Sequence, residues 1–210
     1  MDWEETETIE QQPLPVITVI LVLINVGAYL YTEWKGSSLD AEFMIDMGAM
    51  YEPAVEGHEY YRIITHFFLH FGLEHLVNNM IALLVLGYTL EQDIGRIRYL
   101  ILYMLSGILS GFVSVYVNWS LGENVVSCGA SGAIYGLMGA LLMVLLKNRK
   151  QIVRGDIIRF GIYLVLSLYS GMQDTGIDNT AHFSGVVAGF ILCSVLYQRK
   201  NKTDIRIGGY

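Results

Sequence analysis

Residues 129–147 read GASGAIYGLMGALLMVLLK, an apolar run whose only charged residue is the final lysine. A run of about 17 to 25 apolar residues is long enough to cross the hydrocarbon core of a bilayer as a helix. This run opens on the motif Gly129-Ala130-Ser131-Gly132, so a hydroxyl lies at the start of the predicted helix. The segment therefore predicts a membrane fold with a polar group near one membrane surface.

The composition of the chain also favours an integral membrane protein. Hydrophobic residues make up 53% of its 210 residues, charged residues make up only 16%, and the mean hydropathy is +0.45. A soluble domain ordinarily carries about 25% charged residues. The net charge of -7 argues against a nucleic-acid partner. The two cysteines, Cys128 and Cys193, form neither a disulfide framework nor a metal-binding pattern, so we expect no cofactor and no metal.

Apolar segments of membrane-spanning length recur along the chain and predict an all-α membrane protein with six transmembrane helices. The predicted spans are 14–33, 75–92, 97–118, 130–147, 157–173 and 180–198. The fifth has the weakest pattern, because Arg159 interrupts its start. The long loop between the first two spans is rich in aromatic residues, so we expect short interfacial helices there. The predicted domains are an acidic cytoplasmic tail (1–13), the six-span domain (14–198) and a C-terminal cytoplasmic tail (199–210).

Basic residues predict the orientation of the spans. Eleven of the thirteen Lys and Arg residues follow spans two and six or flank the connection between spans four and five, leaving Lys35 and Arg62 for the long loop. Because basic residues concentrate on the cytoplasmic side, both termini should be cytoplasmic. The N-terminus is acidic where a signal peptide would be basic, so we expect no cleavable signal. Spans two, four and six then run from outside to inside.

This orientation brings four polar residues to one depth. His75, Asn79, Ser131 and His182 all lie near the starts of spans two, four and six. Ionisable groups inside a membrane are costly and are usually functional. We therefore expect a site near the outer leaflet, built from residues that are far apart in the sequence.

Ser131 and His182 have the chemistry of a nucleophile and its base. A serine hydroxyl is a poor nucleophile until a neighbouring base accepts its proton. Glycines spaced four apart on spans four and six allow the two helices to approach backbone to backbone. These glycines are Gly132 and Gly136, and Gly185 and Gly189. These glycines pack the two helices whatever the function of the protein. The same close packing brings the side chains of Ser131 and His182 within reach of each other.

Further polar groups suit the stabilisation of an oxyanion. The Ser131 N–H at a helix N-terminus lacks an intrahelical partner, and His75 and Asn79, four apart on one helix face, supply side-chain donors. Tyr135 lies one turn below Ser131, and its ring can stack on the imidazole of His182 and orient it.

In soluble triads a carboxylate orients the base. We expect a dyad, because no acid lies at a useful helical spacing within the His182 segment. Asp174 and Asp178 precede His182 in a loop, so the sequence leaves both of them open as a third member.

At these positions the chain resembles the rhomboid family of intramembrane serine proteases. The family has an arginine followed by three spaced histidines and an asparagine, matched here by Arg62, His66, His70, His75 and Asn79. Its nucleophile motif resembles Gly129-Ala130-Ser131-Gly132 with Tyr135, and its base motif resembles Ala181-His182 followed by Gly185 and Gly189. The resemblance extends from the first span to the sixth.

The resemblance implies that Ser131 is the nucleophile, that His182 is the general base, and that His75, Asn79 and the Ser131 amide form the oxyanion hole. Asn78 would face elsewhere on its helix. The structural positions implied near the site are Arg62, Gly129, Gly132, Gly185 and Gly189, with His66 and His70 forming loop hydrogen bonds and Glu91 a structural position in span two. The family commonly has Trp-Arg where this chain has Tyr61-Arg62, which is a departure in the loop alone.

The implied activity is hydrolysis of single-span membrane proteins near the outer end of their transmembrane segment, through an acyl-enzyme. The implied partners are those substrates and the lipid bilayer, with no nucleic acid, and the implied location is a bacterial plasma membrane. Three alternatives stay open. They are a channel or transporter, for which we find no inverted repeat; a zinc site of His66, His70 and His75; and an inactive relative that escorts membrane proteins.

Overall fold

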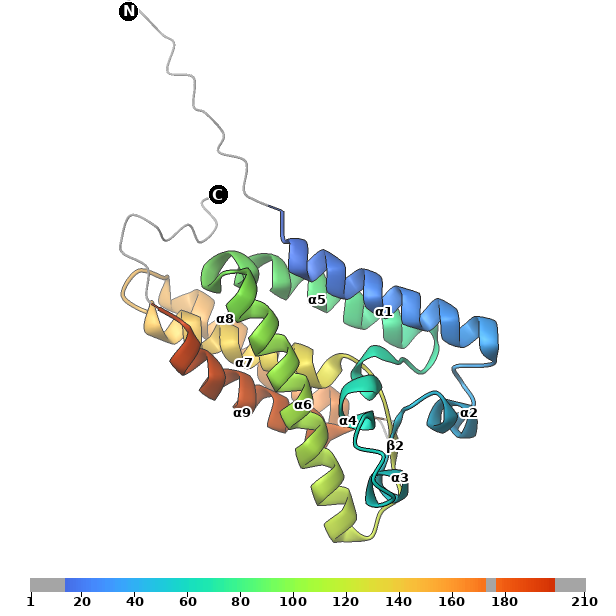
Figure 1. Cartoon of the computed structure of the whole chain (residues 1–210). Coiled ribbons are helices and arrows are strands. Elements are labelled where there is room, and N and C mark those ends of the chain that lie inside the picture. Colours follow the sequence, from blue (N-terminus) through green and yellow to red (C-terminus); the bar gives the residue numbers. More distant parts are fainter. Residues whose placement is uncertain (1–13, 173–176, 199–210) are drawn as a thin grey trace, which may run out of the picture.

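Helices occupy all six predicted spans in the computed structural model, which describes residues 14–172 and 177–198 (Figure 1). They are α1 (Val16–Lys35), α5 (Gly72–Ile94), α6 (Arg96–Leu121), α7 (Ser131–Lys147), α8 (Arg154–Met172) and α9 (Asn179–Leu196). This arrangement confirms the predicted helical class. The two predicted tails, 1–13 and 199–210, lie outside the described residues, as does Asp174.

The helices differ in whether their length and apolar character are sufficient to cross a membrane. Within the described residues, α1, α5, α6 and α9 are the four that are long and apolar enough to do so, and α7 is a shorter apolar helix of 17 residues. In the part of the chain that is described, helix α8 is not among the helices that are both long and apolar enough to cross a membrane. Its first turns carry Arg154, Asp156 and Arg159, which lower its apolar character. The segment predicted as the weakest span is therefore the least apolar of the long helices.

The connection between α1 and α5 folds into short elements, as expected for the long loop. These are α2 (Ala41–Asp46), β1 (Met50–Tyr51), α3 (Glu52–Glu56), α4 (Arg62–Thr65) and the 3-10 turn η1 (His66–Phe68). Strand β1 pairs antiparallel with β2 (Val126–Ser127), just before α7. This pairing was not predicted, because strands of two residues show no periodic pattern. It ties the loop directly to the segment that leads to Ser131.

Arg62 holds this loop together from within. Its side chain is buried, and Nη1 donates hydrogen bonds to the carbonyl oxygens of Ile45 and Ala49 at 2.5 and 2.9 Å. Its Nε and Nη2 donate to the Glu59 carboxylate. A guanidinium has five N–H donors in a fixed plane, so one side chain can satisfy several acceptors at once. Arg62 therefore has a geometry suited to a structural part in the loop.

Helices α1 and α5 are joined by a buried carboxylate. Glu91 of α5 accepts the N–H groups of Ile17 and Thr18, and the Thr18 hydroxyl, at 3.0, 2.9 and 2.9 Å. The first N–H groups of a helix have no intrahelical partner, and they favour a negative charge. Glu91 thus accepts hydrogen bonds from free N–H groups at the N-terminus of α1, in place of water.

Helices α7 and α9 pack backbone to backbone. A Cβ added at Gly189 would overlap the carbonyl oxygen of Gly136, and one added at Gly185 would overlap the carbonyl oxygen of Gly132. On its other face α7 meets α6, since a Cβ at Gly136 would collide with the side chain of Ser106. The glycine spacing predicted to permit close packing therefore lies at the contact itself.

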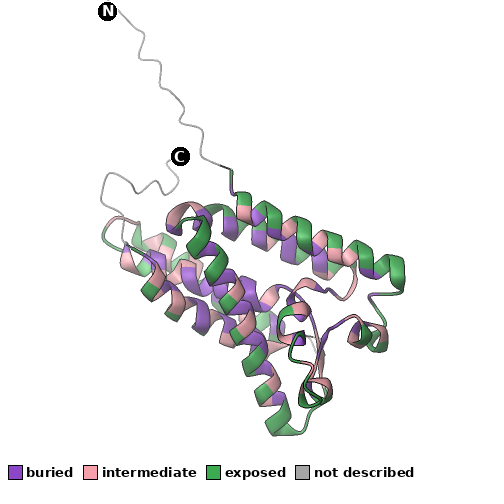
Figure 2. Cartoon of the chain, in the orientation of Figure 1, coloured by how far each residue is buried: buried purple, intermediate pink, exposed green. Residues whose placement is uncertain are grey.

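Buried residues line the centre of the bundle, and exposed apolar residues cover the outward sides of its helices (Figure 2). In α8, Leu164 and Gly171 are the buried residues, so this helix lies at the edge. Figure 1 shows that α5, α7 and α9 begin toward the end of the bundle that carries α2 to α4. The first turns of those three helices therefore meet at one end of the molecule.

The glycine contact predicts a large effect of a single methyl group. In Gly189→Ala the new Cβ meets the backbone of Gly136, which cannot move aside as a side chain can, so the free energy of unfolding should fall by about 2 kcal/mol or more. Thermal unfolding of the purified protein in detergent measures this. Gly161→Ala is the matched control, because a Cβ there meets nothing within 4 Å. Equal stability of the two variants would contradict a tight contact between α7 and α9.

Candidate active site

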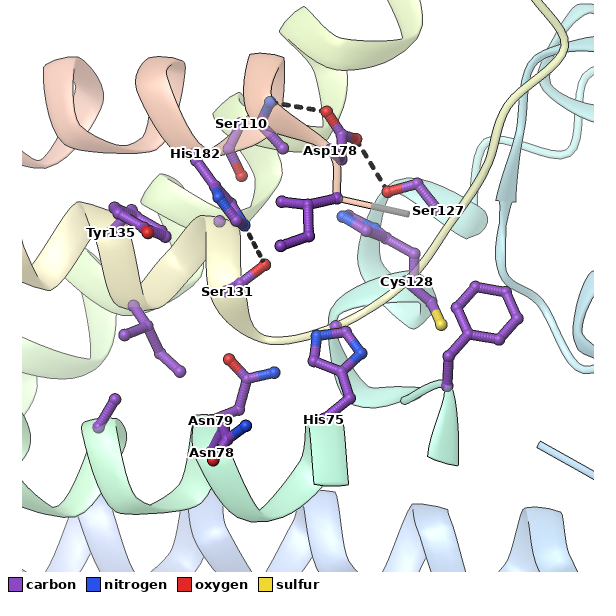
Figure 3. A pocket seen from close by; sticks show the side chains of 18 of the residues that line it. His75, Asn78, Asn79, Ser110, Ser127, Cys128, Ser131, Tyr135, Asp178 and His182 are labelled. Carbon is purple, nitrogen blue, oxygen red and sulfur yellow. Dashed lines mark hydrogen bonds between the residues drawn. The ribbon is translucent and has the colours of Figure 1, made fainter. Parts of the chain in front are cut away.

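Ser131 and His182 meet where α7 and α9 begin. Ser131 is the first residue of α7, and His182 lies in the first turn of α9. The Nε2 atom of the buried His182 lies 2.8 Å from the Ser131 Oγ (Figure 3). For the hydroxyl to donate, Nε2 must accept, and the imidazole proton then lies on Nδ1. This is the geometry in which an imidazole activates a serine hydroxyl.

The backbone before Ser131 is held by the outer loop. The Gly129 N–H donates to the His66 carbonyl oxygen at 3.0 Å, and the Ala130 N–H donates to Nε2 of His70 at 3.4 Å. Burial lowers the pKa of His70 to about 3, so the ring is neutral and can accept this hydrogen bond. His66 in turn contacts the Arg62 carbonyl oxygen through Nδ1 at 2.9 Å. Both histidines therefore make loop hydrogen bonds that support the segment before the serine.

Gly129 gives room to a side chain from another helix. Its φ is +135°, in the region that favours glycine. A Cβ at this position would lie 2.6 Å from Cε1 of His75. Only a residue without a side chain lets the His75 ring come this close to the turn before Ser131.

His75 and Asn79 lie across Ser131 from His182. Figure 3 shows both side chains on the far side of the serine, directed toward it from α5. The Nδ2 atom of Asn79 is buried and has no hydrogen-bond partner among the described residues. An unpaired donor beside a serine hydroxyl is suited to an oxyanion that would form only during a reaction.

Two details of α5 differ from the sequence-based expectations. The helix begins at Gly72 rather than at His75, so Asn79 lies one turn deeper than the first turn. Asn78 was expected to face elsewhere, but it also lines the cavity. Asn79 is the more buried of the two, with 7% of its surface exposed.

Tyr135 stacks on the imidazole of His182. The ring centroids of Tyr135 and His182 are 4.2 Å apart with an interplanar angle of 26°. The Tyr135 hydroxyl shares a hydrogen bond of 2.7 Å with Ser167 on α8. Ser167 was not identified from the sequence, where it only dilutes an apolar segment. No local pattern marks it, because its partner is 32 residues away on another helix.

Asp178 does not contact the imidazole by a hydrogen bond. Its carboxylate accepts three other donors, which are the Ala181 N–H and the hydroxyls of Ser114 and Ser127, at 2.9, 2.6 and 2.8 Å. The Nδ1 atom of His182 has no hydrogen-bond partner within residues 14–172 and 177–198. Of the two aspartates that the sequence left open, Asp178 is thus engaged elsewhere.

A cavity of about 660 Å³ opens beside Ser131. Its walls come from the starts of α5, α7 and α9, from the segment before α7, and from Tyr163 and Ser167 of α8. This volume is typical of a binding site, and polar side chains from several elements line the wall. The alternative of a zinc site at His66, His70 and His75 gains no support, since no group of three metal-ligating side chains is found in the described part of the chain.

Comparison with known proteins gives a consistent group of relatives. The family model for the Rhomboid domain matches residues 57–199. The chain is 31% identical over 186 residues to rhomboid protease GluP of Bacillus subtilis (strain 168), covering 89% of this chain and 36% of that protein. It is 31% identical over 191 residues to the putative rhomboid protease YdcA of the same organism, covering 90% and 92%.

A plant protein is also similar. RHOMBOID-like protein 5 of Arabidopsis thaliana is 40% identical over 158 residues, covering 73% of this chain and 49% of that protein. The chain therefore spans about a third of GluP and half of RHOMBOID-like protein 5, but nearly all of YdcA.

The contact between Ser131 and His182 predicts how the serine reacts. A fluorophosphonate probe should label Ser131 of the purified protein, and His182→Ala should slow labelling by about 100-fold or more, because the hydroxyl loses its base. Mass spectrometry of the labelled peptide gives the site and the rate. His58→Ala, which changes an exposed histidine of the outer loop, is the control and should label normally. Unchanged labelling of the His182 variant would remove this residue from the role of base.

Proposed function

The chain belongs to the rhomboid family, and from this membership and the geometry of the site we propose that it is an intramembrane serine endopeptidase. It is an integral membrane protein, as the family and the apolar helices support. The observation that carries the proposal is the 2.8 Å contact between His182 Nε2 and Ser131 Oγ. These two residues are the proposed catalytic dyad.

The first half of the reaction forms an acyl-enzyme. Ser131 Oγ attacks the carbonyl carbon of the scissile peptide bond while His182 Nε2 takes the hydroxyl proton. Negative charge develops on the carbonyl oxygen, and the donors proposed for it are the side chains of His75 and Asn79 with the Ser131 N–H. The unpaired Nδ2 of Asn79 supports this assignment.

Acylation ends when the C–N bond breaks: His182 gives its proton to the leaving amine, and the N-terminal fragment of the substrate stays bound to Ser131 as an ester. The second half of the reaction consumes water. Water enters the cavity and attacks the ester carbon while His182 takes one of its protons; the bond to Ser131 Oγ then breaks, and His182 returns the proton to Oγ as the new carboxyl end leaves. Throughout these steps Tyr135, stacked on the imidazole, keeps Nε2 directed at Ser131.

We assign single-span membrane proteins as the substrates. A spanning helix satisfies its own backbone hydrogen bonds, so its peptide bonds resist attack until it unwinds. The dyad lies where α7 and α9 begin, which is the end of the bundle that carries the outer loop. The cut is therefore expected near the outer end of the substrate helix, where Gly or Pro would ease unwinding.

The proposed topology has six spans in a bacterial plasma membrane, with both termini cytoplasmic. The domain 14–198 forms the catalytic unit, and 1–13 and 199–210 form cytoplasmic tails. The start of α1 and the end of α9 lie toward the same end of the bundle, which supports this arrangement (Figure 1). Basic residues near Lys150 mark the cytoplasmic side, while the turn at Glu123 faces outward.

Cleavage of a model single-span protein by the purified enzyme in liposomes tests the function. Ser131→Ala should lower the rate by at least about 10⁴-fold, because it removes the nucleophile. Ser194→Ala is the control, since its hydroxyl bonds to the Ile191 carbonyl near the opposite end of α9. Persistence of cleavage in the Ser131 variant would refute the serine mechanism. Loss of wild-type activity on chelation, reversed by zinc, would favour the metal alternative.

Labelling with a membrane-impermeant maleimide tests the topology. On intact cells Glu123→Cys should be labelled, and Lys150→Cys should be labelled only after lysis, because the two exposed positions lie on opposite sides of the membrane. The native Cys128 and Cys193 are buried, so the background should be low. The reverse pattern would invert the proposed orientation.

A further inference from the structure

Asp178 joins three elements at the edge of the site. Its Oδ1 accepts the Ala181 N–H at 2.9 Å and so caps α9, the helix that carries His182. Its Oδ2 accepts the hydroxyls of Ser114 on α6 and Ser127 on β2 at 2.6 and 2.8 Å. Figure 3 shows this carboxylate beside the candidate site, with a dashed line to Ser127. One side chain therefore connects α9, α6 and the strand that precedes α7.

The polar contacts continue from Ser114 into the outer loop. Ser114 and Asn118 are buried on one face of α6, and Asn118 Nδ2 donates to Glu52 Oε1 at 3.0 Å. The other oxygen of Glu52 accepts the Val125 N–H at 2.8 Å. The segment before the nucleophile is thus held by two carboxylates, by Glu52 at Val125 and by Asp178 at Ser127. Buried hydrogen bonds to charged groups are among the stronger ones in proteins.

We propose that Asp178 is a positioning residue that sets the separation of Ser131 and His182. Ser127 precedes Ser131 by four residues, and Asp178 precedes His182 by four. Both connections are short, so a shift at either end reaches the reacting atoms. A misplacement of about 1 Å between reacting groups can lower a rate by about 10²-fold. This inference rests on the proposed hydrolysis and adds a residue at the cavity wall that makes no hydrogen bond to the imidazole.

The contacts distinguish this role from that of a triad acid. A triad aspartate accepts the Nδ1–H of the base. Here Nδ1 of His182 has no partner among the described residues, and both oxygens of Asp178 accept other donors. Asp178 therefore acts through a helix cap and a strand, and not by accepting the Nδ1–H of the base.

Steady-state cleavage by the full-length protein in liposomes measures the effect. Asp178→Ala should lower kcat by about 30- to 100-fold with KM within about twofold, because alignment is lost and binding is kept. Asp178→Asn should stay within about fivefold of wild type. Its amide oxygen still caps Ala181, and its NH₂ group donates to the oxygens of Ser114 and Ser127.

A double-mutant cycle tests whether Asp178 acts through its hydrogen bond to Ser127. Ser127→Ala should lower kcat. The double variant Ser127→Ala with Asp178→Ala should have a kcat within about twofold of that of Asp178→Ala alone, because both substitutions break the same hydrogen bond between Asp178 and Ser127. The matched control is Asp40→Ala. Asp40 also caps a helix, α2, through the N–H groups of Glu42 and Phe43, but it is exposed in the outer loop.

The rate of fluorophosphonate labelling of Ser131 gives a readout without substrate. It should fall in parallel with kcat in Asp178→Ala, and it tests the alignment separately from peptide hydrolysis. Wild-type kcat and labelling in Asp178→Ala would overturn the proposal. So would an Asp178→Asn variant as inactive as Asp178→Ala beside a fully active Ser127→Ala, since that pattern requires the charge. If Asp178→Ala does not fold, the Asn and Ser127 variants decide the question by the same criteria.

Discussion

The direct backbone contact between α7 and α9 is the constraint on which the site depends. Helices packed through ordinary side chains lie about 8–10 Å apart, with side chains filling the space between their backbones. Gly136 and Gly189 remove the side chains at this contact, so the two backbones touch. The first turns of both helices are then close enough for the 2.8 Å contact between Ser131 and His182.

The surroundings of this contact follow from the need to satisfy polar groups without bulk water. Glu91 accepts the free N–H groups of α1, and Arg62 donates to carbonyl oxygens inside the outer loop. The segment before Ser131 is held by loop histidines, by strand pairing and by two carboxylates. Asn79 is a contrasting case, because its Nδ2 has no partner in the described structure. The segment before Ser131 is thus held by hydrogen bonds, and Nδ2 of Asn79 and Nδ1 of His182 lie within the site without a partner among the described residues.

The sequence predicted those features that depend on local patterns. Apolar length predicted all six long helices, charge asymmetry predicted that the starts of three of them share one end, and glycine spacing predicted the α7–α9 contact. It did not predict the pairing of β1 with β2 or the link from Tyr135 to Ser167, because each partner is decided by tertiary packing. Asp178 was considered only as a possible third member of a triad. Its actual partners, Ser114 and Ser127, lie 64 and 51 residues away, and no spacing rule connects them.

The buried loop histidines also link folding to the proton concentration. Burial lowers the pKa of His66 to about 4 and that of His70 to about 3, against about 6.5 for a free imidazole. Below pH 6.5 the unfolded chain therefore binds protons that the folded protein excludes, and the free energy of unfolding declines as the pH falls toward 4. Above pH 6.5 both rings are neutral in either state and the contribution is complete. Protonation of these two histidines thus weakens the segment around Ser131 in acid, and the two rings add no pH dependence well above pH 6.5.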